Sequence, residues 1–431
     1  MPPGGNFPKR LAIGTSQFGH LRNLLAAVMG SNPFYTEKFN AAGANYKMRD
    51  LGQFTEDVPF TTKAEIIADQ AANPPFGTNL TFPLNRYTRL HQTSGTSGTP
   101  IRWLDTPESW NWMLGNWEQI YAAAGVGRGD RVFFAFSFGP FLGFWTAFES
   151  AQRVGALCLP GAALNSSARV RAILEHQANV LCCTPTYAVH LANTAAEEGI
   201  DLTQSPVKTI IVAGEPGGSI PATRALLERL WPGARIFDHH GMTEVGPVTY
   251  ECPARPGVLH VIETSYLTEV VNPATGAPIN YGTETGELIL TTLGRVGSPL
   301  MRYRTGDLVK PGYDGQCECG HYDLTLEGGI LGRTDDMVIV RGVNIFPSAV
   351  EQIIRARPEV TEFRVRIITR DALPEMEVDV EIQNGDAPAV VQQLGTAFDE
   401  AFRLRVPIVA VPPGTLPRAE SKSQRFVTVA S

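Results

Sequence analysis

Apolar residues recur at helical spacing in several stretches of the first 240 residues. One stretch lies within residues 15–45, and three others are ESWNWMLGNWEQIYAAAG, SARVRAILEHQ and ATRALLERLW. Short apolar runs lie among these three: RVFFAF, GALCLP, NVLCCT, TIIVAG and ARIFDHH. Strands that alternate with helices are typical of a parallel sheet covered by helices, and we predict such a sheet over residues 105–240.

The pattern changes further along the chain. Residues 259–310 contain apolar runs separated by Gly, Pro and Asn, which predicts β-hairpins. After residue 335, two strand-like runs and a helix near 387–404 predict a compact α+β unit. We therefore expect an α/β fold with two domains. The large N-terminal domain, residues 1–334, has helix-covered mixed or parallel sheets and a β-rich part at about 250–331. The small α+β C-terminal domain is residues 335–431.

Composition and charge narrow the class of protein. The 431 residues are 43% hydrophobic and 18% charged, which is normal for a soluble protein with a large core. With 36 Lys and Arg against 43 Asp and Glu, the net charge is −7, and no basic run favours nucleic acid. The first residues, MPPGGNFPKR, lack the apolar core of a signal peptide. We expect a cytoplasmic protein without a nucleic-acid partner.

One apolar segment is long enough to cross a membrane. It is VFFAFSFGPFLGFWTAFESA, residues 132–151, and Glu149 is its one charged residue. Gly139 and Pro140 interrupt it in the middle, and no basic residues flank it. We predict a buried strand, a turn and a buried helix, and hence no membrane partner.

A loop of small residues follows a strand-like segment in the sequence RLHQTSGTSGTPIRW. A Gly/Ser-rich stretch is often a flexible linker. The alternative is a phosphate-binding loop, because backbone N–H and hydroxyl groups can surround an anion. The loop ends with Gly98, Thr99 and Pro100, without the Gly-Lys-Ser/Thr ending of the common P-loop. Its position inside the large domain favours phosphate binding.

Four further motifs follow this loop in order: HHGMTE, YRTGDL, GRTDDMVIVRGVNIFP and LPRAESKSQR. Together with the loop they resemble the adenylate-forming superfamily. The segments PFTTK and RGVNIFPSAVE are similar to its phenylacetate–CoA ligase family. The resemblance implies that ATP and a carboxylic acid form an acyl-adenylate with release of pyrophosphate, and that CoA then displaces AMP. It also leaves open two other functions. The acceptor would be the phosphopantetheine of a carrier protein, or the protein would bind nucleotide or acyl ligand without catalysis. Family members often form homodimers, so a homodimer of this chain is an expectation of the resemblance.

The resemblance implies a role for each matching residue. Lys422 would be the adenylation lysine, although Ser421 stands where the family has Gly. Thr243 would contact the α-phosphate, Glu244 would hold Mg²⁺, and Asp335 would be the hinge of a mobile C-terminal domain. Asp307 would bind the ribose, and His240 would stack near the adenine. The full nucleotide-binding set is Thr93, Ser94, Gly95, Thr96, Ser97, Gly98, Gly214, Glu215, Pro216, Asp238, His239, His240, Gly241, Met242, Asp307 and Arg333.

The acid is expected beside the adenine, in a pocket with apolar walls. The predicted lining is Phe136, Phe138, Phe141, Gly214, Pro216, His239, Gly246 and Pro247. Such walls suit an aromatic acid, whereas the alternative is that these Phe residues pack the core. Gly217 and Gly218 stand where the phenylacetate enzymes have bulkier residues. A substituted benzoate or another aryl acid is therefore expected at least as much as phenylacetate itself. His239 would hydrogen-bond a ring hydroxyl or amine.

Six cysteines fall into two groups. Cys158, Cys182 and Cys183 lie in apolar runs and are predicted to pack in the core. The other three lie in polar loops. Together with one histidine they would make a closed tetrahedral zinc site, which is structural rather than catalytic. The predicted ligands are Cys252, His260, Cys317 and Cys319, with His321 as an alternative to His260 and unligated thiols as the alternative to a metal.

Overall fold

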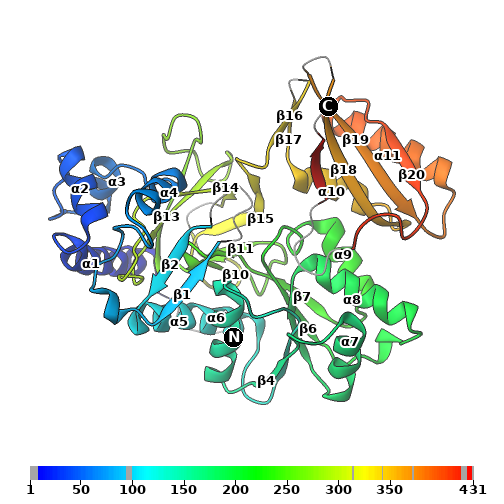
Figure 1. Cartoon of the computed structure of the whole chain (residues 1–431), viewed down its shortest axis with the longest axis horizontal. Coiled ribbons are helices and arrows are strands. Elements are labelled where there is room, and N and C mark those ends of the chain that lie inside the picture. Colours follow the sequence, from blue (N-terminus) through cyan, green and yellow to red (C-terminus); the bar gives the residue numbers. More distant parts are fainter. Residues whose placement is uncertain are drawn as a thin grey trace.

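A parallel sheet covered by helices forms one side of the large domain, as the alternating pattern predicts (Figure 1). Its five strands are in the order β4-β3-β5-β6-β7, and neighbouring strands pair in parallel. The strands are β3 (Arg131–Phe134), β4 (Leu157–Pro160), β5 (Val180–Cys183), β6 (Thr209–Val212) and β7 (Arg235–Asp238). The associated helices are α5 (Pro107–Ala124), α6 (Leu142–Arg153), α7 (Ser166–Glu175), α8 (Pro185–Glu197) and α9 (Pro221–Leu230).

Both faces of this sheet are buried. Successive side chains of a strand point to opposite faces, so Cys182 packs in one apolar cluster and Cys183 in the other. Cys158 on the edge strand β4 is half-buried and packs against the first cluster. The prediction that Cys182 and Cys183 belong to the core is confirmed.

An antiparallel sheet forms the β-rich part of the chain. Its six strands are in the order β10-β11-β15-β14-β13-β12. They are β10 (Thr249–Glu251), β11 (Leu259–Val261), β12 (Tyr266–Val271), β13 (Gly286–Thr292), β14 (Tyr303–Pro311) and β15 (Thr325–Arg333). Two short strands, β8 (Gly241–Met242) and β9 (Gly246–Pro247), form a hairpin between the two sheets in the sequence.

Residues 8–93 and 100–105 contain four helices and one hairpin. The helices are α1 (Arg10–Val28), α2 (Pro33–Ala42), α3 (Leu51–Asp57) and α4 (Lys63–Ala72), followed by the 3-10 turn Leu84–Arg86. A second 3-10 turn, Leu202–Gln204, precedes β6. The hairpin strands are β1 (Arg89–Gln92) and β2 (Arg102–Asp105). Asn32 begins α2 and Thr62 begins α4, each through a side chain that accepts a backbone N–H bond.

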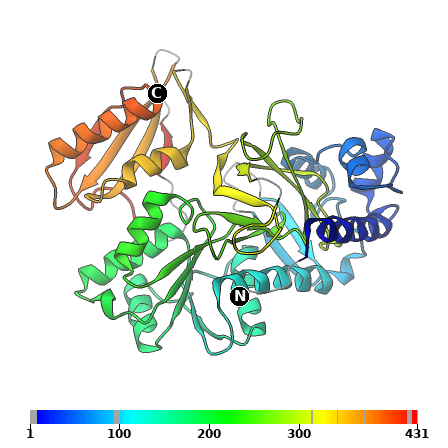
Figure 2. The same ribbon diagram turned by 180° about the vertical axis from the view of Figure 1, so that it is seen from behind.

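The small domain is a four-stranded sheet with two helices (Figures 1 and 2), and its helix α10 contacts β15 of the antiparallel sheet. The sheet has the strand order β20-β19-β18-β21. The elements are β16 (Val338–Val340), β17 (Val343–Ile345), α10 (Pro347–Arg355), β18 (Val360–Arg370), β19 (Leu373–Ile382), α11 (Ala387–Phe402), β20 (Ile408–Val411) and β21 (Phe426–Val429). The predicted fold class, α/β with a β-rich part and an α+β C-terminal unit, is confirmed.

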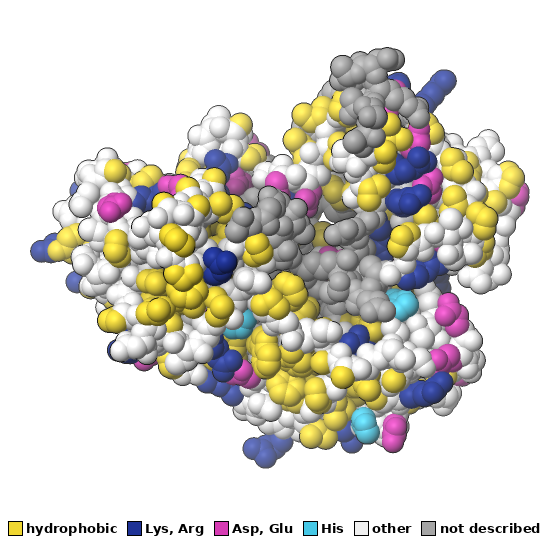
Figure 3. Space-filling model, viewed as in Figure 1, with side chains coloured by type: hydrophobic (Ala, Val, Ile, Leu, Met, Phe, Trp, Pro, Cys, Tyr) yellow, Lys and Arg dark blue, Asp and Glu magenta, His cyan; other side chains and the backbone are white. Residues whose placement is uncertain are grey.

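This computed structural model describes residues 8–93, 100–312, 315–341, 343–370, 373–418 and 425–429. The apolar segment 132–151 forms β3, a turn and α6, as predicted. Within the described ranges no helix has both the length and the apolar character that a membrane crossing requires. Figure 3 shows acidic and basic side chains interspersed over one face of the molecule.

Candidate active site

Six of the predicted nucleotide-binding residues lie at the carboxyl ends of two parallel strands. Gly214, Glu215 and Pro216 follow β6, and the segment from Asp238 to His240 spans the end of β7. In open α/β sheets this edge is where ligands bind. The antiparallel sheet supplies two more, because Asp307 lies in β14 and Arg333 ends β15.

Asp307 is the centre of a buried charged group. It lies opposite Arg333 in the pairing of β14 with β15, and its Oδ1 accepts a 3.0 Å bond from an Arg333 guanidinium nitrogen. His240 Nε2 lies 3.0 Å from Asp307 Oδ2. Burial alone would raise the pKa of the Asp307 carboxyl, but His240 and Arg333 outweigh it and lower the pKa. The group is therefore ionised at neutral pH.

The second oxygen of this carboxylate is available to a ligand. Asp307 Oδ2 and His240 Nε2 are buried, and among the described residues neither makes a hydrogen bond of good geometry. A buried carboxylate oxygen without a donor is costly, so such an atom marks a place for hydroxyl groups. This arrangement fits the ribose role that the resemblance implies.

The MTE segment lies in the turn between β8 and β9. The backbone carbonyls of Thr243 and Glu244 accept bonds of 2.8 Å and 2.7 Å from one guanidinium nitrogen of Arg295. Asp105 holds the same guanidinium through two 2.7 Å bonds, and both charged groups are fully buried. The sequence analysis missed this pair, because neither residue lies in a recognisable motif.

Glu244 has the surroundings expected of a cation ligand. Its side chain is 7% exposed, and Lys63 Nζ lies 3.9 Å from its Oε1. Its carboxylate makes no side-chain hydrogen bond to any other residue in the described ranges. Because Mg²⁺ takes few protein carboxylates and completes its coordination with phosphate oxygens and water, one such Glu fits the predicted role.

The two residues before His240 have different surroundings. Asp238 accepts a 2.6 Å bond from Ser219 Oγ, and burial raises the pKa of its carboxyl to about 6. His239 is buried, and neither of its ring nitrogens has a hydrogen-bond partner within the described part of the chain. Its ring meets that of Trp117 nearly edge-on, with the centroids 4.4 Å apart. Burial lowers the pKa of His239 to about 3, so the ring is neutral.

The glycine pair after Pro216 is packed against protein rather than facing open space. A Cβ on Gly217 would lie 2.5 Å from the Pro185 side chain, and Gly217 has a φ of +157°. A Cβ on Gly218 would lie 2.5 Å from the Asp238 carboxyl carbon. The absence of side chains here allows Pro185 and Asp238 to approach. Gly217 and Gly218 therefore do not indicate a larger acid-binding pocket.

Aromatic rings gather near the same edge of the parallel sheet. The rings of Phe136 and Phe144 stack at 4.0 Å, and Phe138 contacts Phe136 edge-on. Helix α6, which carries Phe144, contacts the β8–β9 hairpin. Phe136 is almost fully buried and Phe141 is 38% exposed, so these two rings are placed differently. Gly246 and Pro247 are buried, and Gly246 lies against Met113 of α5.

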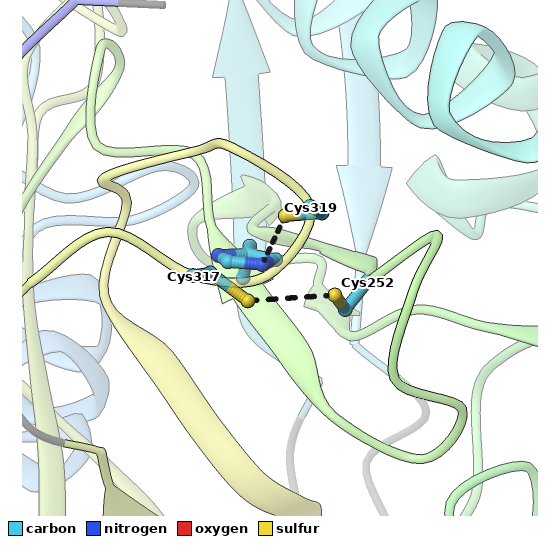
Figure 4. A group of neighbouring side chains, drawn as sticks. Cys252, Cys317 and Cys319 are labelled. Atoms are coloured by element: carbon cyan, nitrogen blue, oxygen red, sulfur yellow. Dashed lines mark hydrogen bonds between the residues drawn. The ribbon is translucent and has the colours of Figure 1, made fainter. Parts of the chain in front are cut away.

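The four predicted zinc ligands come together as a cluster (Figure 4). Their ligand atoms all lie within 4.8 Å of one another. The Sγ atoms of Cys252 and Cys317 are 3.7 Å apart, and Cys319 Sγ is 3.3 Å from His260 Nε2. Two sulfur atoms bound to one tetrahedral zinc ion at about 2.3 Å would themselves be about 3.8 Å apart. The spacing of this donor set fits zinc.

A neighbouring backbone group orients the imidazole ring of the histidine in the cluster. His260 Nδ1 lies 3.0 Å from the backbone oxygen of Asp323, which leaves Nε2 for the cluster. His321, the alternative ligand, is instead 2.8 Å from the Tyr250 hydroxyl through its Nδ1. The structure therefore places His260, rather than His321, among the three thiols.

Several predicted residues cannot be placed. Ser94 to Gly98 and Lys422 lie outside the described residues. Thr93 is described: its N–H donates to the Ile101 carbonyl, and its Oγ1 accepts the Ile101 N–H at 3.1 Å. The Ser/Thr/Gly loop thus connects the paired strands β1 and β2 and does not link two domains. Asp335 lies in the turn between β15 and β16, where Arg333 contacts both of its carboxylate oxygens.

Comparison with known proteins gives matches over nearly the whole chain. Residues 88–294 match the AMP-binding enzyme family, and residues 342–428 match the AMP-binding enzyme C-terminal domain. The phenylacetate–coenzyme A ligase of Escherichia coli K12 is 30% identical over 414 residues, covering 91% of this chain and 89% of that protein. The enzyme of the same name from Thermus thermophilus is 29% identical, covering 94% of each.

A solved structure has the same fold throughout. The 2-hydroxyisobutyryl-CoA ligase, in its postadenylation state with an acyl-AMP, is 25% identical and superposes with a TM-score of 0.92 over 100% of this chain and 94% of that one. The same ligase in its thioesterification state gives 0.70 over 98% and 90%. The names of these relatives give CoA as the acceptor and offer no support for a carrier protein. The chain belongs to the phenylacetate–CoA ligase-like family of adenylate-forming enzymes, and it is an AMP-forming acid–CoA ligase.

Proposed function

We propose that the acid activated by this CoA ligase is aromatic, an aryl or arylacetic acid. The observation that carries the proposal is the set of aromatic rings around Phe136 and Phe138, at the strand edge where the nucleotide-binding residues gather. Aromatic rings in offset and edge-on contacts favour a flat apolar ligand. The relatives named phenylacetate–CoA ligases support the same class of acid.

The reaction has two chemical steps, the first at a phosphorus atom and the second at a carbon atom. In the first, a carboxylate oxygen bonds to the α-phosphorus of ATP, and the bond from that phosphorus to the bridging oxygen breaks, so that pyrophosphate leaves with the electron pair. In the second, the CoA sulfur bonds to the acyl carbon, and the bond from carbon to the AMP oxygen breaks. Both steps depend on alignment and on neutralising negative charge.

This chain's residues would serve the first step as follows. Asp307 would accept the ribose hydroxyls through its unpaired Oδ2, and His240 would lie beside the adenine. Thr243 would contact the α-phosphate, and Glu244 would hold Mg²⁺, which supplies positive charge at the phosphates when bound. Lys422 would bridge the carboxylate and the α-phosphate. The Arg295–Asp105 pair would fix the backbone of the Thr243–Glu244 turn.

His239 supports an acid with a polar ring substituent. A neutral, buried imidazole can donate from one nitrogen and accept at the other. A substrate hydroxyl or amine beside His239 would give this side chain a partner. Replacing His239 with Phe would then lower the preference for hydroxybenzoate over benzoate by at least about 10-fold, because the substituent would lose that bond.

Zinc would act as a structural element in the antiparallel sheet. The proposed ligands Cys252, His260, Cys317 and Cys319 fill all four tetrahedral positions, so the ion would have no open position for catalysis. The cluster would tie the turn between β14 and β15 to β10 and β11. The homodimer stays a prediction.

The direct test is pyrophosphate release from ATP and Mg²⁺ with a panel of acids, each with and without CoA. The panel contains phenylacetate, benzoate, hydroxybenzoates, aminobenzoates and the aliphatic 2-hydroxyisobutyrate. We expect one aromatic acid to exceed 2-hydroxyisobutyrate in kcat/KM by about 10-fold or more, which is the discrimination that an apolar pocket provides. Lys422→Ala is the control and should abolish the release. A higher kcat/KM for the aliphatic acid than for every aromatic acid would overturn the proposal.

A further inference from the structure

A buried arginine joins the small domain to the large one. Arg425 directly precedes β21 and is 8% exposed. Within the small domain its Nε and one terminal nitrogen donate to the two oxygens of Glu362, at 2.6 Å and 3.2 Å. Its other terminal nitrogen donates to Thr186 Oγ1, at 3.2 Å, in helix α8 of the large domain. One guanidinium therefore spans the domain junction.

Helix α10 makes a second contact across the same junction. It lies against α9 of the large domain (Figure 1). Glu351 Oε1 accepts a 3.3 Å bond from Thr223 Oγ1, and Gln352 Oε1 accepts a 3.0 Å bond from the Ala222 backbone N–H at the start of α9. The Arg425 guanidinium also lies 3.9 Å from Glu351 Oε1. The two contacts are thus linked through one carboxylate.

The large-domain side of the junction leads to the nucleotide site. The backbone N–H of Thr186 donates to Glu215 Oε1 at 2.9 Å. Glu215 belongs to the Gly214–Pro216 segment at the end of β6. The Glu215 side chain therefore faces the junction. Thr186 stands between this segment and the arginine of the small domain.

The two domains are arranged most like those of the related ligase in its postadenylation state. The chain superposes far better on the related ligase in its postadenylation state than on the same enzyme in its thioesterification state, although the identity is almost the same. We infer that the small domain of this chain is placed as in the postadenylation state. A small domain turned as in the thioesterification state would lose the contacts of Arg425 with Thr186 and of Gln352 with Ala222. The contact of Arg425 with Glu362 is internal to the small domain.

We propose that Arg425 is a positioning residue for adenylation, which holds the small domain on the large one through Thr186. The contact with Thr186 breaks when the small domain turns for thioester formation. The inference rests on the proposed role of Lys422, three residues earlier in the chain. It predicts that weakening the contact slows the first half-reaction and spares the second.

Thr186→Val is the sharpest test. Valine has a similar shape and keeps the backbone N–H that donates to Glu215, so it removes only the hydroxyl that accepts from Arg425. Acid-dependent exchange of labelled pyrophosphate into ATP measures adenylation. Thioester formation from purified acyl-adenylate and CoA measures the second step. We expect the exchange to fall about 10-fold, as for the loss of a hydrogen bond to a charged group, with thioester formation unchanged or faster.

Three variants complete the design. Arg425→Lys keeps the charge but lacks the planar fork, and it should show the same imbalance. Thr194→Val removes a hydroxyl that bonds only within α8, and it should change neither step. Equal losses in both half-reactions, or an unchanged exchange rate in Thr186→Val, would overturn the proposal. Lys422→Ala distinguishes the role of Arg425 from that of the lysine. If Lys422→Ala retains pyrophosphate exchange, the proposed role of the lysine is wrong. If Lys422→Ala loses the exchange while Thr186→Val keeps the parent rate, only the role of Arg425 is wrong.

Discussion

At the scale of single residues, Asp307 shows how a buried charge is prepared for a ligand. Arg333 neutralises one oxygen, and the other lies 3.0 Å from His240 Nε2 without a hydrogen bond of good geometry among the described residues. Asp307→Asn would replace a charged acceptor with a neutral amide. We expect kcat/KM for ATP in pyrophosphate release to fall by about 10- to 100-fold, which is the range for a hydrogen bond to a charged group.

The exposed residue Asp399 provides the matched control for this substitution. Asp399→Asn makes the same chemical change on the surface of α11 and should leave kcat/KM for ATP as in the parent. If Asp307→Asn also retained kcat/KM for ATP, the ribose assignment would be wrong.

His239 gives a residue-scale prediction for stability against pH. Burial lowers its pKa from 6.5 to about 3, so between these values the unfolded chain binds a proton that the folded chain does not. Stability is therefore lost as pH falls below 6.5, by about 1 kcal/mol per pH unit from this group. His239→Gln should show a smaller drop in thermal unfolding midpoint from pH 7 to pH 5.5. An equal drop in both proteins would show that His239 is not the titrating group.

Residue-scale predictions from the sequence were strongest where a motif carries the chemistry. Asp307, His240 and Arg333 stand in recognisable motifs, and the structure brings them into one buried group. Asp105 and Arg295 stand in none, because a partner 190 residues away leaves no local pattern. The Gly217–Gly218 pair was interpreted from its type alone, whereas only the structure shows that Pro185 and Asp238 occupy the space beside it.

At the scale of elements, the Arg295–Asp105 pair holds the β8–β9 turn. Arg295→Met would leave the Asp105 carboxylate buried without its partner and free two backbone carbonyls. We expect a loss of about 3 to 5 kcal/mol in unfolding free energy, as for a broken buried ion pair. The double variant Asp105→Leu/Arg295→Met removes both charges and should be more stable than the single variant. Denaturant unfolding of the three proteins measures the difference, and a double variant less stable than the single would contradict this account.

The thiol cluster is a second element-scale feature, because it joins three segments of the antiparallel sheet. Metal analysis of the purified protein should give about one zinc per chain. Cys317→Ser should lower both the zinc content and the thermal midpoint, whereas Cys158→Ser, outside the cluster, should keep the zinc. A metal-free parent protein with the same midpoint would contradict the proposed site.

Whole elements were predicted well from the apolar spacing. The alternation over residues 105–240 gave the parallel sheet, since strands buried on both faces read as short apolar runs. The hairpins of residues 259–310 followed from their turn residues. The sequence did not reveal strand order, in which β15 lies between β11 and β14, because pairing between distant strands depends on the packing of the whole sheet.

At the scale of the whole molecule, the turn at Asp335 is the predicted hinge between the two domains. Proline at this position would fix φ and restrict rotation, while asparagine keeps the backbone free. Starting from the postadenylation-like arrangement, Asp335→Pro should retain pyrophosphate exchange and lose at least about 10-fold in thioester formation, because hinge motion is needed for the second step. Asp335→Asn should retain both. Normal thioester formation in the proline variant would place the hinge elsewhere.

The separation of Asp105 from Arg295 also bears on how the protein is made. A chain that leaves the ribosome N-terminus first exposes Asp105 long before its partner is synthesised. The β8–β9 turn, although complete in sequence by residue 247, must await residue 295 to be held in place. We therefore expect the β8–β9 turn to take its final form late in folding. A fragment cut at residue 294, where the match to the AMP-binding family ends, would carry every residue of that turn yet lack the arginine that secures it.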